Sequence, residues 1–523
     1  MPFSPNPQYT FRSVPHKSFT RLWFEVDKNK LSFKDGKKWF PFNNGGGFRK
    51  WFGLNDTVVN WENDGYEIKK LAKQKYNSIT RTVTNLNSYF IPGITWSVIA
   101  SGSASFRMYE KGFIFSNSGQ CMISNDENLR FNIIGLLNSK ITNSLLSILS
   151  PTIGFESGYL KKLPVNCSDK RSISKEKECI LISKQDWDAH EISWDFQKNE
   201  LVRLKEIRQL LTTTENISNI CTDIKDLYIN YCSFWKEQFT QLHFNEEELN
   251  RQFIEIYDLQ DELTPNVPLE EITILQQGEI TIKDNEITFN ADAIMKQFIS
   301  YAVGCWMGRY RLDRPGLQIA HPNPTEEETA PYSYNGEEFT IDDDAIIPLM
   351  SRDCAFDDNA VSRFTDFVRI TFGAETLTES LNFIEESLEK TLEDYFVKDF
   401  WKDHKKMYQN RPIYWLFSSK KGAFQCITYM HRMDAYTVEK IRSKYLLPHI
   451  EYLSNHILEM ENRAASLSTQ ERKKLDKLRK DLDECQEYHN RLHIIADEQI
   501  AFDLDDGVLV NHAKFRDVVA KIK

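Results

Sequence analysis

The charge balance and the local sequence pattern of the chain both change near residue 165, and this change limits the folds that the chain can adopt. Residues 1–165 carry 21 Lys and Arg against 11 Asp and Glu, a balance of +10, whereas residues 166–523 carry 44 against 65, a balance of −21. The first part has short β-rich runs between Gly, Asn, Ser and Pro, and the second is mostly helical. We therefore expect an α+β multidomain protein in which a mixed α/β domain precedes mostly helical domains.

Turn residues and shifts in composition divide the chain into four predicted segments. Residues 1–165 form the mixed domain, and residues 166–265 form a helical connector that ends at a Thr-Pro pair. Residues 266–345 are predicted to hold a β-hairpin, a helix and an acidic loop. Residues 346–523 form a helical C-terminal domain.

The clearest periodicity of the chain lies in the C-terminal domain. Apolar and small residues there recur at steps of three and four. They are Ile450, Leu453, Ile457, Met460, Ala464 and Leu467, and then Leu475, Leu478, Leu482, Cys485, His489 and Leu492. Ser468 and Glu471 between the two runs form a capping box. The pattern predicts a long antiparallel helical hairpin at about 448–500, which serves either as a spacer or docking arm or simply as packing for its own domain.

Cysteine usage and hydropathy indicate the cellular location of the protein. The nine cysteines form no Cys-x-x-Cys pair, and no charged-then-apolar signal segment opens the chain. We therefore expect a reducing, cytoplasmic location without a disulfide framework. No apolar run approaches the roughly 20 residues that a membrane span requires, so no membrane association is expected.

Candidates for catalysis and for metal binding are weak. Asn6-Pro7-Gln8-Tyr9 resembles the motif that holds a flipped adenine, but no buried strand precedes it and no Gly-rich cofactor loop is found. His489 and His493 have zincin spacing without the general-base Glu or a third ligand. Asp342-Asp343-Asp344 fits a solvated loop or helix N-cap better than a cation site. We therefore predict no catalytic residue and no metal ligand.

The basic domain carries the positive signals, which are those of nucleic-acid recognition. A Gly-rich turn precedes Arg49 and Lys50, which are predicted to neutralise phosphates. Aromatic planes that could stack on bases are Trp51, Trp61 and Trp96. Each of these tryptophans taken alone is better explained by a place in the core. Together with the balance of +10, they favour contact with DNA.

Short polar side chains in the same domain could read base edges. Asn63 offers an amide that matches an adenine edge. Hydroxyl and guanidinium groups follow Trp96 closely, at Ser97, Ser101, Ser103 and Arg107. An apolar core has no need of so many donors and acceptors, and we predict that they lie near the bases.

Stretches along nearly the whole chain resemble the PglX proteins, the adenine-specific DNA methyltransferases of BREX phage-defence systems. The resemblance is carried by segments in the same order: 21–26, 38–43, 59–65, 256–265, 299–305, 308–310, 411–417 and 503–508. Residues 136–164 are also similar to the end of a target-recognition module of restriction-modification specificity subunits.

The resemblance implies a division of labour. In that family a preceding catalytic domain binds S-adenosylmethionine and methylates a flipped adenine at N6, and a target-recognition domain with a helical C-terminal part follows. This chain resembles the second half, and we expect it to lack the catalytic domain and the cofactor. The implied partners are double-stranded DNA and a separately encoded methyltransferase half or other defence-system proteins.

Two other functions stay open at this stage. The acidic C-terminal segments could make the chain a non-enzymatic interaction or scaffold subunit of a defence complex. A stand-alone enzyme such as a nuclease is the third reading, although the sequence supplies no metal cluster for it. Of the three, a DNA-recognition function explains the basic, aromatic domain best.

Overall fold

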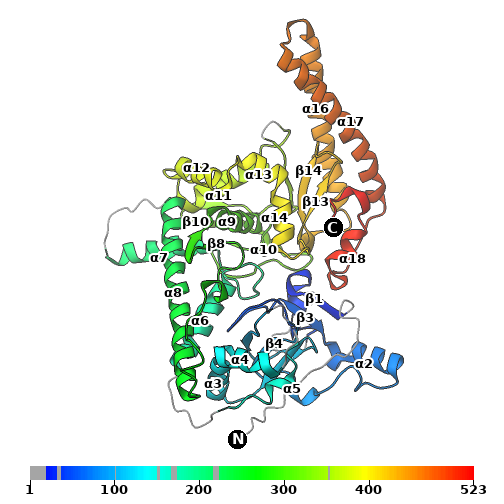
Figure 1. Ribbon diagram of the computed structural model, residues 1–523. Coiled ribbons are helices and arrows are strands. Elements are labelled where there is room, and N and C mark those ends of the chain that lie inside the picture. Colours follow the sequence, from blue (N-terminus) through cyan, green and yellow to red (C-terminus); the bar gives the residue numbers. More distant parts are fainter. Residues whose placement is uncertain are drawn as a thin grey trace. The chain divides into compact units, whose positions relative to one another are not determined.

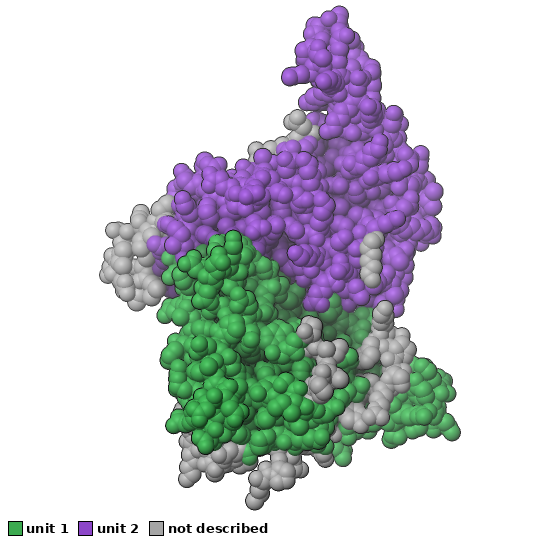
Figure 2. Space-filling view, viewed as in Figure 1, with its two compact units in different colours: residues 1–23, 29–196, 230–290 green, residues 24–28, 197–229, 291–523 purple. Residues whose placement is uncertain are grey.

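The structure is a computed structural model that describes residues 19–31, 37–99, 102–149, 154–165, 173–215, 223–351 and 354–522, without the side chains of 211–215. The chain divides into two compact units (Figure 2). Unit 1 comprises residues 1–23, 29–196 and 230–290, and unit 2 comprises residues 24–28, 197–229 and 291–523. The predicted boundaries at 165, 265 and 345 do not coincide with this division.

Two small sheets form the centre of unit 1. The first has the order β1-β3-β2-β6 and the second the order β5-β4-β7. The strands of the first sheet are β1 (Thr20–Leu22), β2 (Trp39–Asn43), β3 (Thr57–Asn60) and β6 (Ile114–Phe115). Those of the second are β4 (Gly93–Ser97), β5 (Phe106–Tyr109) and β7 (Gly119–Ile123). Pairing is antiparallel throughout, except between β2 and β6.

Aromatic side chains fill the core of unit 1. Trp61 and Tyr89 meet edge to face with ring centroids 5.2 Å apart, and Tyr89 packs in the same way on Phe115. Val59 and Ile68 complete this buried cluster from β3 and the helix that follows it. Since such pairs add stability beyond the area they bury, the aromatic content of the basic domain is explained in large part by packing.

The helices of unit 1 begin and end at residues with local hydrogen bonds. They are α2 (Glu62–Tyr76), α3 (Glu127–Asn138), α4 (Lys140–Leu149), α5 (Ser157–Leu160) and α6 (Ser174–Asp188). The Asp126 carboxylate accepts from the amide of Leu129 and caps α3. The helix predicted over 129–149 is broken at Ser139, whose extended backbone separates α3 from α4.

A long helix and a β-hairpin complete unit 1. Helix α8 (Ile224–Ile256) begins in unit 2 and contributes residues from Asn230 onward to unit 1. Strands β8 (Ile280–Lys283) and β9 (Glu286–Phe289) pair in the predicted hairpin. Asp284 and Asn285 turn the chain with φ of 52° and 61°, a conformation that Asp and Asn tolerate.

Helix α9 (Ala291–Trp306) is the centre of unit 2. Every residue from Phe298 to Trp306 is buried, as expected of a helix covered on all sides. Phe298 contacts three phenylalanines of the neighbouring helix and its end. The surrounding helices are α7 (Glu200–Glu215), α11 (Ala360–Phe372), α12 (Leu377–Leu388), α13 (Leu392–Lys398) and α14 (Phe400–Met407).

A three-stranded antiparallel sheet joins these helices in unit 2. Its strands are β12 (Ile346–Pro348), β13 (Tyr414–Ser418) and the central β14 (Gln425–Tyr429). Successive side chains of a strand face opposite sides. Because four consecutive residues are buried in both β13 and β14, the sheet is covered on both faces.

The acidic segment 323–344, predicted to be a loop, contains regular secondary structure. It holds the short helix α10 (Glu326–Thr329) and a hairpin of β10 (Tyr332–Tyr334) and β11 (Glu337–Phe339). The turn is Asn335-Gly336, with both residues at positive φ. An Asn-Gly pair is a strong hairpin signal, and here it outweighs the acidic composition.

The C-terminal part of unit 2 ends in two long helices. A short helix α15 (Thr437–Lys440) continues through a π-helical turn into α16 (Leu447–Asn462), and α17 (Thr469–Asp497) and α18 (Val508–Ala513) follow. Arg479 pairs with Glu461, and Arg442 donates to His489, so α16 and α17 run antiparallel. Figure 1 shows the two helices extending side by side beyond β13 and β14.

Charged side chains interrupt the longest of the described helices. Even the 33-residue α8 carries Lys, Asp, Glu and Arg along its length. Within the described ranges, no helix has both the length and the apolarity that crossing a membrane requires.

Candidate nucleic-acid interface

Arg49, predicted to contact phosphate, lies inside unit 1. Its guanidinium donates to the carbonyls of Phe52 (2.7 Å), Thr273 (3.0 Å) and Ser183 (3.0 Å). It also forms an ion pair of 2.8 Å with Asp186, whose side chain is 1% exposed. The guanidinium is therefore satisfied by the unit's own groups.

Lys50 and Trp51 share one buried carboxylate. The Lys50 ammonium pairs with Glu246 of α8, and the Trp51 indole donates to the other oxygen of Glu246 at 2.7 Å. The Lys50 amide donates to the Thr273 hydroxyl at 3.0 Å. These contacts tie the turn before β3 to α8 and to the segment that follows it.

Three more of the predicted DNA contacts belong to the same interior. Arg107 donates to the Arg49 carbonyl at 3.2 Å, and its other terminal nitrogen lies 3.5 Å from the Ser97 hydroxyl. Burial, together with the nearby Arg49 charge, lowers the pKa of Arg107 to about 10. Trp96 is fully buried and donates to the Phe155 carbonyl at 2.8 Å.

The structure thus brings six of the predicted residues together, but on the inside. Arg49, Lys50, Trp51, Trp96, Ser97 and Arg107 are each less than a tenth exposed. A buried charge is tolerated only with a partner, and here the partners are Asp186 and Glu246. A phosphate or base could not reach these groups without unpacking the unit, so we correct their assignment from DNA contact to structural support.

The four remaining predicted residues have different surroundings. Trp61 is buried beneath Lys69, whose ammonium lies 5.2 Å from the ring centroid. Asn63 is exposed at the start of α2, in a left-handed conformation with φ of 50°. Ser103 is half-buried, and Ser101 lies outside the described residues.

An exposed basic surface lies on α2 and the segment after it. Lys70, Lys73, Lys75 and Arg81 are all exposed there, next to Tyr66, which is 58% exposed. Lys70 lies over the Tyr66 ring, with its ammonium 5.8 Å from the centroid. Figure 1 shows α2 to one side of the strands of unit 1. We call these five residues, with Asn77, the α2 basic surface.

Amide side chains and left-handed turns accompany these cations. Asn77 ends α2 at φ 52°, and its amide N–H donates to the Lys73 carbonyl. Asn85, at φ 56°, and Asn87 are also exposed. Cations suit phosphates, and exposed amides and rings suit base edges and faces. The α2 basic surface therefore exposes cations, amides and an aromatic ring, whereas the cations and rings of Arg49, Lys50 and Trp51 are buried inside unit 1.

Sequence reasoning missed this surface although the sequence carries a signal for it. Residues 68–109 contain six Lys and Arg and no Asp or Glu. Such an acid-free stretch within a chain of net charge −11 marks a cationic surface better than any Trp or Gly-rich motif.

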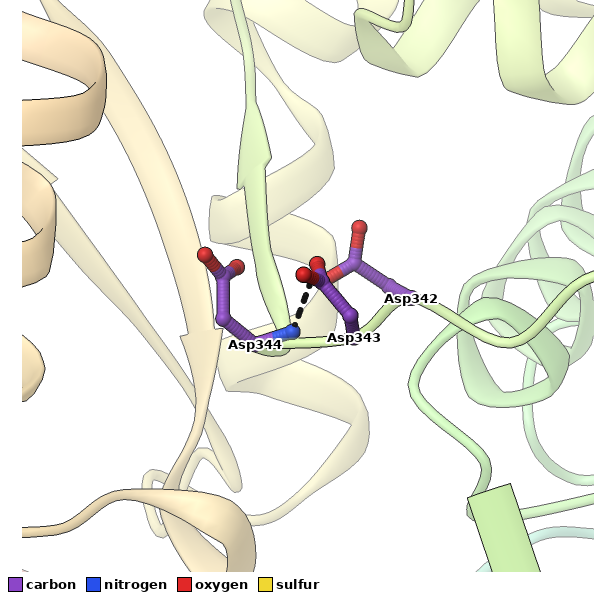
Figure 3. A group of neighbouring side chains, drawn as sticks. All are labelled: Asp342, Asp343 and Asp344. Carbon is purple, nitrogen blue, oxygen red and sulfur yellow. Dashed lines mark hydrogen bonds between the residues drawn. The ribbon is translucent and has the colours of Figure 1, made fainter. Parts of the chain in front are cut away.

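Asp342, Asp343 and Asp344 of unit 2 lie next to one another (Figure 3). The Asp342 carboxylate pairs with Arg363 at 2.6 Å, and Asp344 pairs with Lys444 at 3.1 Å and accepts from the Tyr445 hydroxyl at 3.0 Å. Their carboxylate oxygens lie within 4.8 Å of one another. Because the chain's own cations balance two of the three charges, the cluster is explained as a structural ion-pair network.

Comparison with known proteins finds similarity to two adenine-specific methyltransferases. The chain is 36% identical over 535 aligned residues to the adenine-specific methyltransferase BrxX of Escherichia coli O9:H4 (strain HS), covering 97% of this chain and 42% of that protein. It is 35% identical over 519 residues to the adenine-specific methyltransferase PglX of Lacticaseibacillus casei (strain Zhang), covering 95% and 41%. The chain thus spans about two fifths of the length of these curated relatives. No family model matches it.

S-adenosylmethionine is the methyl donor that such a class implies. Nucleotide-like cofactors of this kind sit at the carboxyl ends of a parallel, doubly wound sheet. Among the described strands, only β2 and β6 pair in parallel, over two residue pairs. The described residues do not form such a crevice, and we place no cofactor contact and no step of methyl transfer on them.

Proposed function

We propose that this chain is the DNA-recognition portion of an adenine-specific (N6) DNA methyltransferase of a phage-defence system. The similarity to BrxX and PglX over nearly the whole chain supports the class. The exposed α2 basic surface supports contact with a polyanion. In this proposal a catalytic domain outside these residues holds S-adenosylmethionine and modifies the base.

The observation that carries the proposal is that some cations of unit 1 are buried and others are exposed. Arg49, Lys50 and Arg107 are buried, and the charges of Arg49 and Lys50 are compensated by Asp186 and Glu246. Lys70, Lys73, Lys75 and Arg81 are exposed in a stretch without acids. Phosphates are drawn by such exposed cations, and counterion release makes their binding salt-dependent.

Each part of the α2 basic surface has a role in the proposal. Lysines act as point charges and position the duplex without reading sequence. Tyr66 and Asn77, together with Asn63 at the start of α2, are candidates for contact with exposed bases or groove edges. Amide readout of this kind discriminates bases by roughly 1–3 kcal/mol per contact.

The test removes the charge of this surface while keeping the fold. The variant Lys70→Gln, Lys73→Gln, Lys75→Gln should bind labelled duplex DNA more weakly than the wild-type chain. The slope of log K against log salt should shrink in magnitude by up to about 3, roughly one for each phosphate that the variant no longer neutralises. Fluorescence anisotropy between 50 and 200 mM salt, the range of concentrations in which such slopes are usually seen, measures it.

A matched control separates this effect from a change in net charge. Lys398, Lys402 and Lys406 are exposed on α13 and α14 among acidic residues, and their change to Gln removes the same three charges. The control should bind like wild type. Equal binding by all three proteins would refute DNA contact at α2. No binding of DNA by the wild-type chain would refute the proposed function and favour the scaffold role.

A further inference from the structure

The distal part of α16 and α17 is held together by its own side chains. Ile457 and Met460 of α16 pack with Leu467 and Leu475 in a separate buried cluster, against which Leu478 and Leu482 are half-buried. The capping box of Ser468 and Glu471 starts α17. This end of the two helices, which we call the arm, therefore has a buried seam of its own.

A row of lysines runs along the outer face of the arm. Lys473, Lys477 and Lys480 are exposed and follow one another by four and three residues, which places them on one face of α17. The buried seam follows Leu475, Leu478 and Leu482. At 100° per residue the lysines point away from that seam.

A loop of the β13–β14 hairpin extends the row. Glu484, one turn beyond Lys480, accepts from the Ser419 hydroxyl at 2.6 Å and from the Lys421 amide at 2.6 Å. The loop is therefore fixed against α17, and it carries Lys420 and Lys421 with exposed side chains. The five lysines together form what we call the lysine row: 420, 421, 473, 477 and 480.

Cations outnumber acids in the arm. Residues 457–482 contain seven Lys and Arg and five Asp and Glu. Of these acids, Glu471 accepts from the Ser468 amide in the capping box, and Glu461 and Asp476 both lie against Arg479. The arm thus keeps a small positive balance in a protein of net charge −11.

We propose that the lysine row is a second DNA contact, which binds the phosphate backbone of duplex DNA beside the recognition site. The inference rests on the proposed function above. Along α17 the three lysines are spaced by about 6 and about 4.5 Å, at 1.5 Å per residue, which is close enough for flexible side chains to follow successive phosphates.

The composition of the row favours DNA over a protein partner. Lysine is depleted at protein–protein interfaces, where aromatic residues, Met and Arg are enriched. The row offers ammonium groups alone, with no amide or ring among its members. Such a surface binds phosphate without reading sequence, as a contact flanking a recognised site requires.

The test uses the full chain with Lys473→Gln, Lys477→Gln and Lys480→Gln. On a long duplex the magnitude of the salt slope should fall by about 2–3 relative to wild type. On a duplex too short to extend beyond the recognition surface, wild type and variant should have the same slope. The variant Lys398→Gln, Lys402→Gln, Lys406→Gln is the control of equal charge and should match wild type on both.

The outcomes separate this inference from the proposed function. If the wild-type chain does not bind DNA at all, the proposed function fails, and this inference with it. If wild type binds and the α2 variant is weakened but the row variant is unchanged on the long duplex, only the lysine row as a DNA contact is refuted. Loss of binding to polyglutamate by the row variant, with DNA binding unchanged, would instead assign the row to an acidic protein.

Discussion

At the scale of single residues, unit 1 depends on charges that are buried in pairs. Arg49 with Asp186 and Lys50 with Glu246 join residues far apart in sequence, and the carbonyls of Ser183 and Thr273 complete the shell of Arg49. Removing one partner of such a pair leaves the other charge uncompensated in a poorly solvated place, which costs more than the intact pair contributes.

The Asp186→Asn variant should therefore be strongly destabilised. We expect the free energy of unfolding of unit 1 to fall by about 3–5 kcal/mol, because Arg49 keeps its charge without a carboxylate. Asp195→Asn removes an exposed partner of Lys184 in the same unit and should cost less than about 1 kcal/mol. Urea unfolding of the two variants measures the difference, and similar midpoints would contradict the structural role given to Asp186.

At the scale of secondary-structure elements, two glycines permit close backbone approaches to β7, from β4 at Gly93 and from the end of β2 at Gly119. A Cβ on Gly93 would lie 2.1 Å from the Met122 carbonyl oxygen, and one on Gly119 would lie 2.5 Å from the Gly45 backbone nitrogen. These neighbours are backbone atoms, which cannot rotate away as a side chain does. Gly93 and Gly119 lie at opposite ends of the paired segment of β4 and β7.

Gly93→Ala should consequently disturb the second sheet of unit 1. Overpacking of this kind costs roughly 1–3 kcal/mol, and a backbone clash belongs at the upper end of that range. Gly102→Ala, in the loop before β5, meets no atom within 4 Å and should unfold like wild type. Thermal unfolding followed by circular dichroism compares them; an unchanged midpoint for Gly93→Ala would show that the strands pair less closely than described.

At the scale of the whole molecule, the two units hold histidines with opposite pKa shifts. In unit 1, burial alone would lower the pKa of His190, but Glu279, 2.6 Å from Nε2, raises it to about 9. In unit 2, burial and the nearby Arg309 charge lower the pKa of His404 and of His431 to about 3. The first is protonated in the folded protein at neutral pH, and the other two are neutral.

The units should therefore lose stability in opposite directions of pH. The contribution of His190 is complete below about pH 6.5, the value of an unfolded His, and is lost as pH rises through about 9. The contributions of His404 and His431 are complete above about pH 6.5 and are lost as pH falls toward 3, each by up to about 1.4 kcal/mol per pH unit.

Calorimetry of point variants between pH 4 and pH 10 measures this dependence, with the pH range set by the two groups of pKa values. His190→Gln should flatten the alkaline side of the stability profile and leave the acid side unchanged. His404→Gln should do the reverse. If either variant changed both sides equally, the separate assignment of the two effects would be contradicted.

Local patterns predicted much of the secondary structure and little of the site. The Ile-rich alternation around Lys283 to Glu286 specified the β8–β9 hairpin, because turn residues and strand residues act over a few positions. The roles of Arg49 and Lys50 could not be predicted in this way. Their partners are 137 and 196 residues further along the chain, and no local pattern reports such a contact.

Composition and short-range periodicity, read from the sequence by themselves, determined the basic first part, the acidic helical remainder and the two amphipathic runs of α16 and α17. Only the tertiary structure decided which of the cations in the basic part face water. Charge is a property of each residue and is visible in the sequence. Its exposure depends on whether a distant carboxylate folds against it, and that places Arg49 and Lys50 inside and leaves Lys70, Lys73 and Lys75 on the surface.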